Sequence, residues 1–100
     1  MLTDSSFRMA IADVFTIKGR GTVITGRVAS GAIRVGDEIF IKGDSGVTKI
    51  AVKGLEANRA QITEAMTGDN IGVLVDEQGK GVFKRGDVLS GSSIDFTINP

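Results

Sequence analysis

The segment from Thr16 to Val28 carries the residues best suited to bind phosphate. It reads T-I-K-G-R-G-T-V-I-T-G-R-V, with three glycines and three cations between branched apolar residues. The spacing of Gly21 and Gly26 matches the two glycines of a nucleotide-binding phosphate loop, but Arg27 and Val28 stand where that loop needs Lys and a hydroxyl residue. The segment therefore does not predict nucleotide hydrolysis.

The same glycines do not form a dinucleotide-binding fingerprint. Gly19 and Gly21 are followed by Ile24 where the third glycine belongs, and the residues after them predict a strand where the fingerprint needs a helix. We therefore expect Gly19 and Gly21 to form the turn of a β-hairpin, and Gly26 to mark a bulge or a close packing contact.

Composition removes most catalytic chemistry. The chain has no histidine and no cysteine, so it lacks the commonest general base, the commonest metal ligand and any thiol nucleophile. Asp76 and Glu77 are adjacent, and neighbouring residues of a strand point to opposite faces, so they make a poor acid and base pair. We predict a protein that is not an enzyme and that needs no metal and no cofactor.

Charge and hydropathy give a prediction of location. Twelve basic and twelve acidic residues cancel, so the molecule as a whole has no long-range attraction for nucleic acid or an anionic membrane. Met1 to Phe7 lacks the charged start and apolar run of a signal peptide, and no apolar run is long enough to span a bilayer. We expect a cytoplasmic protein without membrane contact.

The pattern of apolar residues predicts an all-β chain. Residues 7–18 alternate between apolar and polar side chains, with one break near Asp13 that predicts a bulge. Residues 22–29 form the partner strand of the hairpin, and further strands are predicted over residues 38–42, 47–53, 70–75 and 88–89. In Leu55–Met66 the apolar spacing also fits a helical turn, so a helix is the alternative there.

Three Gly-Asp pairs predict three similar turns. Gly takes positive φ readily and Asp hydrogen-bonds nearby backbone, and each pair precedes a predicted strand. The irregular spacing does not indicate a repeat protein. The pairs are Gly36-Asp37, Gly68-Asp69 and Gly86-Asp87.

Several motifs in unbroken order resemble the second domain of translational GTPases, and elongation factor Tu in particular. They are Ile11-Ala12-Asp13-Val14-Phe15, Gly19-Arg20-Gly21-Thr22-Val23, Thr25-Gly26-Arg27-Val28, Val35-Gly36-Asp37-Glu38 and residues 65–72, A-M-T-G-D-N-I-G. The resemblance implies a small closed β-barrel of six to seven strands with Greek-key connections over residues 7–91. Residues 1–6 are then a disordered N-terminal segment, and residues 92–100 a tail that forms a terminal strand. The motifs of the family's GTPase domain have no counterpart here, so we expect a stand-alone domain that does not bind GTP.

The resemblance also implies a binding site. In elongation factor Tu this barrel forms one wall of the pocket for the aminoacyl end of tRNA, and the matching positions are Asp13, Phe15, Thr25, Arg59 and Asn70. Two positions depart from the family: an acidic residue is replaced by Ala12, and an Arg-Gly pair by Asp76-Glu77. These changes alter the charge at the mouth of the site.

Each of these residues also has a structural interpretation. Phe15 fits a core position, because small cores depend on aromatic area. Arg59 fits a surface ion pair with Glu56 or Glu64. Asn70 fits a hydrogen bond to local backbone at the start of a strand.

Three binding functions remain open. The first is contact with ribosomal RNA or tRNA through four cations, Lys18, Arg20, Arg27 and Arg34. The second is contact with an unknown protein partner: Ile94, Phe96 and Ile98 alternate with polar residues in a strand pattern that closes the barrel or adds to a partner's sheet. The third is weak binding of an aminoacyl-tRNA end or small molecule in half a pocket. A structural domain without a translation role is a further alternative, and we expect a monomer, with a tail-mediated dimer as the alternative.

Overall fold

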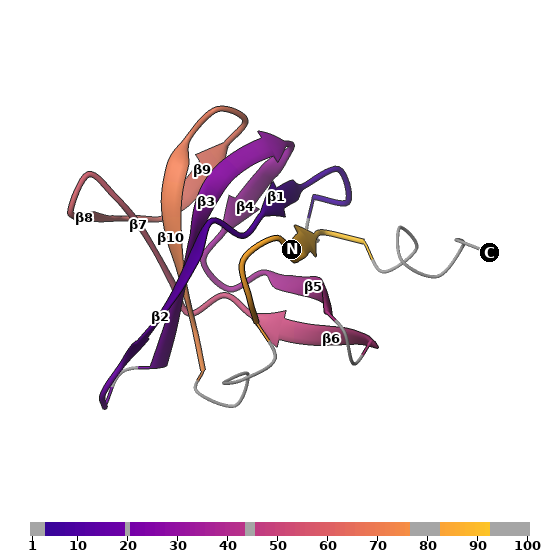
Figure 1. Cartoon of the computed structure of the whole chain (residues 1–100). Helices are drawn as coiled ribbons and strands as arrows, with labels where there is room; N and C mark the ends of the chain where they lie inside the picture. Colours follow the sequence, from indigo (N-terminus) through magenta and orange to yellow (C-terminus); the bar gives the residue numbers. More distant parts are fainter. Residues whose placement is uncertain (1–3, 20, 44–45, 77–82, 93–100) are drawn as a thin grey trace.

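The computed structural model describes residues 4–19, 21–43, 46–76 and 83–92. Within these ranges the chain consists of strands and turns without a helix, which confirms the all-β prediction (Figure 1). The strands are β1 (Arg8–Ala10), β2 (Asp13–Ile17), β3 (Gly21–Ser30), β4 (Ala32–Arg34), β5 (Glu38–Gly43), β6 (Gly46–Ala51), β7 (Gly54–Ala57), β8 (Ala60–Ile62), β9 (Glu64–Met66), β10 (Asn70–Val75) and β11 (Val88–Ser90).

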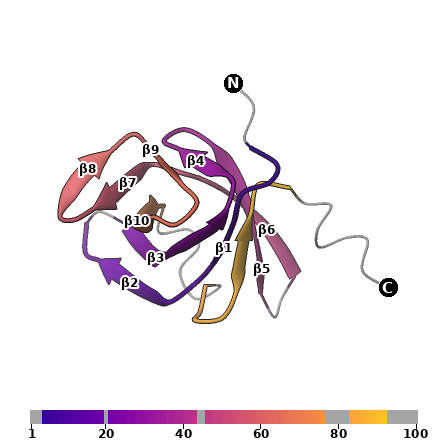
Figure 2. The ribbon, with the colours of Figure 1, turned by 90° about the horizontal axis from the view of Figure 1, so that it is seen from above.

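One curled sheet contains most of these strands. Its order is β6-β5-β11-β1-β3-β10-β7-β8, with β2 paired to β3, and β4 and β9 form a separate two-stranded sheet. Seen from above, the strands wrap around a common interior (Figure 2). The interior is filled by apolar side chains from most of the strands and from the connections: Phe7, Met9, Ile11, Ile24, Val28, Ile33, Ile39, Ile41, Val52, Leu55, Ala65, Ile71, Val73, Val75, Phe83 and Leu89.

Strand β3 organises the sheet because it pairs with β1, β2 and β10. Met9 lies opposite Val28, and Asp13 lies opposite Thr25. The chain thus advances by four residues from β1 to β2 while β3 advances by three. The extra residue confirms the bulge predicted near Asp13. A side chain at Gly26 would collide with a backbone carbonyl oxygen of β1 and press on the Met9 side chain, which confirms that this glycine marks a close packing contact.

The hairpin between β2 and β3 turns through glycine, as predicted. Gly19 has φ of 81° and Gly21 has φ of 124°, values that side chains disfavour. The residue between them, Arg20, lies outside the described residues. This glycine segment is therefore a turn and not the start of a helix.

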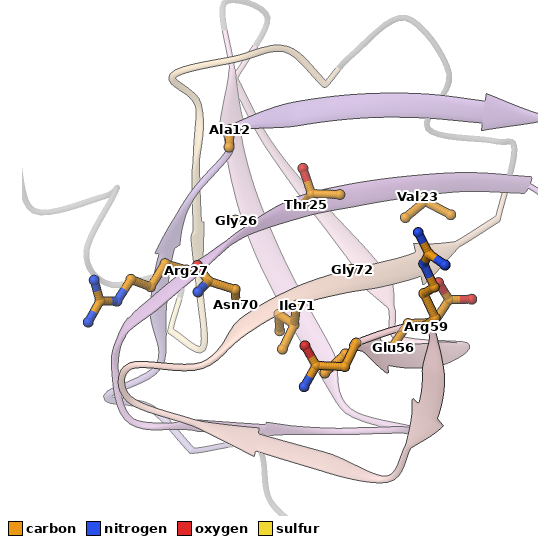
Figure 3. A pocket seen from close by; sticks show the side chains of 12 residues that line it. Ala12, Val23, Thr25, Gly26, Arg27, Glu56, Arg59, Asn70, Ile71 and Gly72 are labelled. Atoms are coloured by element: carbon orange, nitrogen blue, oxygen red, sulfur yellow. The ribbon is translucent and has the colours of Figure 1, made fainter.

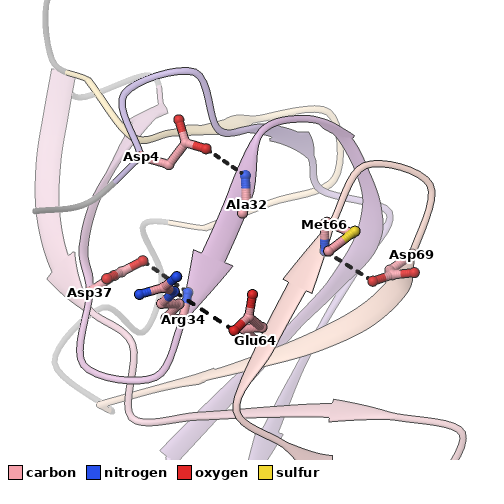
Figure 4. Close-up of polar contacts among 7 residues, drawn as sticks. All are labelled: Asp4, Ala32, Arg34, Asp37, Glu64, Met66 and Asp69. Atoms are coloured by element: carbon pink, nitrogen blue, oxygen red, sulfur yellow. Dashed lines mark hydrogen bonds and ion pairs between the residues drawn. The ribbon is translucent and has the colours of Figure 1, made fainter.

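The three Gly-Asp pairs form three matching type II turns. Gly36, Gly68 and Gly86 have φ of 96°, 95° and 93°. In each turn the carboxylate of the following Asp accepts a hydrogen bond from the backbone N–H three residues earlier, and two of these bonds are drawn in Figure 4. The predicted turn chemistry is confirmed at all three places, and it fixes the chain before β5, β10 and β11.

Residues 55–66 are extended and not helical. They belong to β7, β8 and β9, so the helical alternative is wrong. Apolar spacing misled here because Leu55 and Ala65 point to the core from different strands. The β7–β8 hairpin turns through Asn58 and Arg59, with φ of 54° and 66°.

Candidate functional site

The candidate site lies on the outer face of the curled sheet. Directly opposed residues of antiparallel strands share a face. Thr25 of β3 lies opposite Gly72 of β10, which lies opposite Glu56 of β7. The neighbouring residues Ile24 and Val73 point the other way and are fully buried. The row from Thr25 to Glu56 therefore faces solvent.

An open groove of about 460 Å³ follows this row. Its walls come from the bulge before β2, from β3 and β10, and from the turn of the β7–β8 hairpin (Figure 3). The groove is lined by Ala12, Val23, Thr25, Gly26, Arg27, Glu56, Ala57, Asn58, Arg59, Asn70, Ile71 and Gly72. The bulge before β2, the strands β3, β7 and β10, and the turn after β7 must fold together to form it.

Gly72 keeps the floor of the groove low. It lies at the centre of the row, and a Cβ there would come within 3.1 Å of the Cγ1 atom of Val23. Contacts at that distance are tighter than ordinary packing, so a side chain would raise the floor and push Val23 aside. A flat group can rest against this part of the sheet because the residue is glycine.

The two ends of the groove carry cations. Arg27 lies beside Asn70 at one end, and Arg59 lies beside Glu56 at the other, although the Arg27 side chain extends away from the floor (Figure 3). Among the described residues neither guanidinium forms an ion pair or a hydrogen bond, and the Glu56 carboxylate is also without an ion pair. The groove therefore offers two unpaired guanidinium groups and one carboxylate to a ligand.

Backbone contacts hold the Arg27 end in place. Val28 donates its N–H to the carbonyl oxygen of Asp69 at 2.9 Å, and Gly68 donates to the carbonyl oxygen of Val28 at 2.8 Å. The Gly-Asp turn before β10 is thus attached to β3, which fixes Asn70 next to Arg27.

A family model for elongation factor Tu domain 2 matches residues 21–90. This match spans more than half of the chain. The chain belongs to the elongation factor Tu domain 2 family. Elongation factor Tu domain 2 is a non-catalytic β domain, and within the described ranges no three potential metal-ligating side chains cluster. No helix in the described ranges has the length and apolar character needed to cross a membrane.

The structure brings together three of the five residues expected at an elongation factor Tu-like aminoacyl pocket. Thr25, Arg59 and Asn70 all line the groove. Asp13 lies opposite Thr25 on the same outer face, and Phe15 lies opposite Val23, but both are outside the lining. All five therefore share the groove's side of the sheet.

The structural interpretations of these residues are not supported. Phe15 is 53% exposed and is not part of the core. Glu64 pairs with Arg34 and not with Arg59. The Asn70 side chain makes no hydrogen bond within the described ranges.

Of the four cations expected to contact phosphate, the three that the structure describes do not gather in one site. Arg27 alone lines the groove. Lys18 is exposed in the turn after β2, and Arg34 lies on β4, where its Nε is 3.9 Å from a Glu64 carboxylate oxygen. The fourth, Arg20, lies outside the described residues.

Sequence reasoning missed Arg85, which fixes one wall of the site. Its Nε donates to the carbonyl oxygen of Ala12 and its Nη2 to the Asp13 carboxylate, both at 2.9 Å. The contact joins the turn before β11 to the bulge before β2. No local pattern announces it, because the two residues are 72 positions apart.

Proposed function

We propose that this elongation factor Tu domain 2 protein is a non-catalytic module that binds the end of a single-stranded RNA in the outer-face groove. The observation that carries the proposal is the presence of unpaired Arg27 and Arg59 at opposite ends of one groove, with a glycine floor between them. Phosphate groups of successive nucleotides can contact two such cations, and a base can lie flat between them.

The polar groups between the two cations suit RNA. Single-stranded RNA presents 2′-hydroxyls and base edges that donate and accept hydrogen bonds. Glu56 supplies an acceptor, Thr25 a hydroxyl and Asn70 an amide. An aminoacyl group on the RNA end is the finer form of the proposal, because the family positions that line the groove are those of the aminoacyl pocket.

The test is an NMR titration of the whole chain with a single-stranded RNA hexamer in 50 mM salt. We expect backbone shifts at residues of the groove, with affinity reduced about tenfold by Arg59→Gln or Arg27→Gln, the effect of one charge-assisted contact. Arg34→Gln is the matched control because Arg34 is exposed and away from the groove; its affinity should stay within about twofold of wild type on general charge grounds.

Salt dependence and an aminoacylated hexamer complete the test. Binding through two phosphate contacts should weaken about fivefold between 50 and 150 mM salt, since single strands lose affinity with a slope of about 0.7 per contact. A tighter complex with the aminoacylated hexamer would support the finer form. Absence of shifts with either RNA would overturn the proposal and favour a protein partner, including one that uses the tail, of which residues 93–100 lie outside the described residues.

We also infer that the curled sheet closes into the Greek-key barrel expected from the family. Lys53, after β6, donates its N–H to the carbonyl oxygen of Leu74 in β10 at 2.8 Å, and Val35 donates to Thr63 at 3.0 Å. The first bond joins the β6 end of the sheet path to β10, and the second joins the residue after β8 to the separate β4–β9 sheet. Slow amide exchange at Lys53 and Val35 would support closure, and exchange as fast as in the exposed turns would argue against it.

A further inference from the structure

The turn of the β7–β8 hairpin has an unusual backbone. In the described part of the chain, Asn58 and Arg59 are the non-glycine residues with positive φ, at 54° and 66°. Ala57 lies opposite Ala60, so the two residues form a complete two-residue turn. Positive φ at both positions is typical of a type I′ turn, which Asn followed by Gly forms best.

The two residues tolerate this geometry unequally. Asn enters the left-handed region readily, because its short polar side chain bonds local backbone. Arg has no such compensation, so its Cβ makes the second position strained. Glycine at position 59 would relieve the strain. The native turn therefore contains an avoidable cost to folding.

The geometry has a consequence for the groove. Both turn residues line it, and Arg59 lies at the end where Glu56 also lies (Figure 3). An ion pair between them would neutralise both groups, yet none forms. A rigid two-residue turn fixes the direction in which the Arg59 side chain leaves the backbone.

We infer that Asn58 is a positioning residue, and that the strained Asn58–Arg59 turn directs Arg59 into the groove before a ligand arrives. Asn58 allows the left-handed turn, and the turn holds the Arg59 side chain on the groove's side, available to a phosphate. The inference rests on the proposed RNA site for its functional part. It predicts that relief of the strain at position 59 raises stability and weakens binding.

Variants at position 59 separate strain from charge. Arg59→Gly should raise the urea midpoint of unfolding while weakening binding of the RNA hexamer about tenfold. Arg59→Ala removes the same charge but keeps the Cβ, so binding should weaken equally without the gain in midpoint. If Arg59→Gly lowers the midpoint, the turn is not strained and the inference is wrong.

Variants at position 58 test positioning, since they leave the guanidinium in place. Asn58→Ala should weaken RNA binding about fivefold, because the turn is loosened. Asn58→Gly should bind the hexamer with wild-type affinity, because glycine takes positive φ. A purely structural role predicts that Asn58→Ala lowers the midpoint and binds the hexamer as wild type does. That result would overturn the positioning role.

A measurement without ligand distinguishes failure of this inference from failure of the proposed function. The three-bond HN–Hα coupling and the Cα shift of residue 59 report its φ in the free protein. Positive φ in wild type and Asn58→Gly, with a mixture in Asn58→Ala, supports the positioning device even if the hexamer does not bind. An extended residue 59 in the free wild-type chain would reject it.

Discussion

The three Gly-Asp turns make the same hydrogen bond, from a backbone N–H to an Asp carboxylate, but the three Asp residues differ in burial. Asp37, Asp69 and Asp87 each accept a backbone N–H through the carboxylate, at 2.9, 2.9 and 3.2 Å. Asp37 is only 8% exposed, whereas Asp69 is exposed and Asp87 is intermediate. Replacement of each Asp by Ala removes one bond and leaves one N–H without its acceptor.

Burial sets the expected size of each loss. A hydrogen bond to a charged group contributes about 1.5 to 3 kcal/mol, and a donor left buried costs most of that range. At position 69 water can reach the freed N–H. We expect Asp37→Ala to reduce the free energy of unfolding by about 2 to 3 kcal/mol and Asp69→Ala by about 1 kcal/mol, with Asp87→Ala between them.

Urea unfolding measures the free energy of unfolding of each variant, and the dependence of this free energy on urea concentration should be the same in all of them. Asp37→Asn is the matched control, because an amide oxygen keeps an acceptor of the same reach, and it should lose less than half as much as Asp37→Ala. Equal losses at the three turns, or an Asn variant as unstable as the Ala variant, would refute the argument from burial.

The same Asp variants also test the position of the groove. The Asp69 carboxylate holds the turn before β10, and the backbone carbonyl oxygen of the same residue bonds Val28 beside Arg27. Asp69→Ala should therefore loosen this turn and disturb the Arg27 end of the groove. Asp37→Ala should leave this end unchanged, because no residue of the Asp37 turn lines the groove. RNA affinity that falls more for the Asp37 variant than for the Asp69 variant would contradict this placement of the groove.

Three further predictions concern stability alone. Gly26→Ala should lower the free energy of unfolding by about 2 kcal/mol or more, because the new Cβ would collide with a backbone carbonyl oxygen of β1. Gly54→Ala should raise it by about 0.5 kcal/mol, because the Cβ there would make ordinary contacts. Thermal unfolding compares the two variants, and similar midpoints would contradict the steric reasoning. Thr22 has a buried hydroxyl without a partner among the described residues, so Thr22→Val should be neutral or gain about 1 kcal/mol in urea unfolding, and a clear loss would mean that the hydroxyl is bonded. Hydrogen bonds from the Ser6 hydroxyl and the Ser6 backbone N–H hold the pKa of Asp4 below its ordinary value of 3.8. The stability that this contributes is present above the unfolded pKa and is lost as pH falls through the lower folded pKa, so in acid titration of unfolding the difference between wild type and Asp4→Asn should shrink below pH 3.8 and vanish below the folded pKa. A difference that persists at pH 2 would contradict the assignment.

Interactions between neighbouring residues in the sequence determined the turns and the all-β fold class. Glycine and Asp at positions 36–37, 68–69 and 86–87 specify the same turn wherever they occur, because the requirement for positive φ and the reach of the carboxylate are properties of neighbouring residues. The break in alternation near Asp13 likewise identified the bulge. The order of motifs identified the family before any contact was known.

Only the tertiary structure decided which of these residues form a site. Arg27 and Arg59 are far apart in sequence, and they share a groove because β10 pairs with both β3 and β7. A different pairing, of β4 with β9, places Arg34 beside Glu64, although sequence reasoning had grouped Arg34 with Arg27. Sequence spacing reports which residues can turn or pair locally, but strand register determines which side chains meet, and register depends on contacts across the whole sheet.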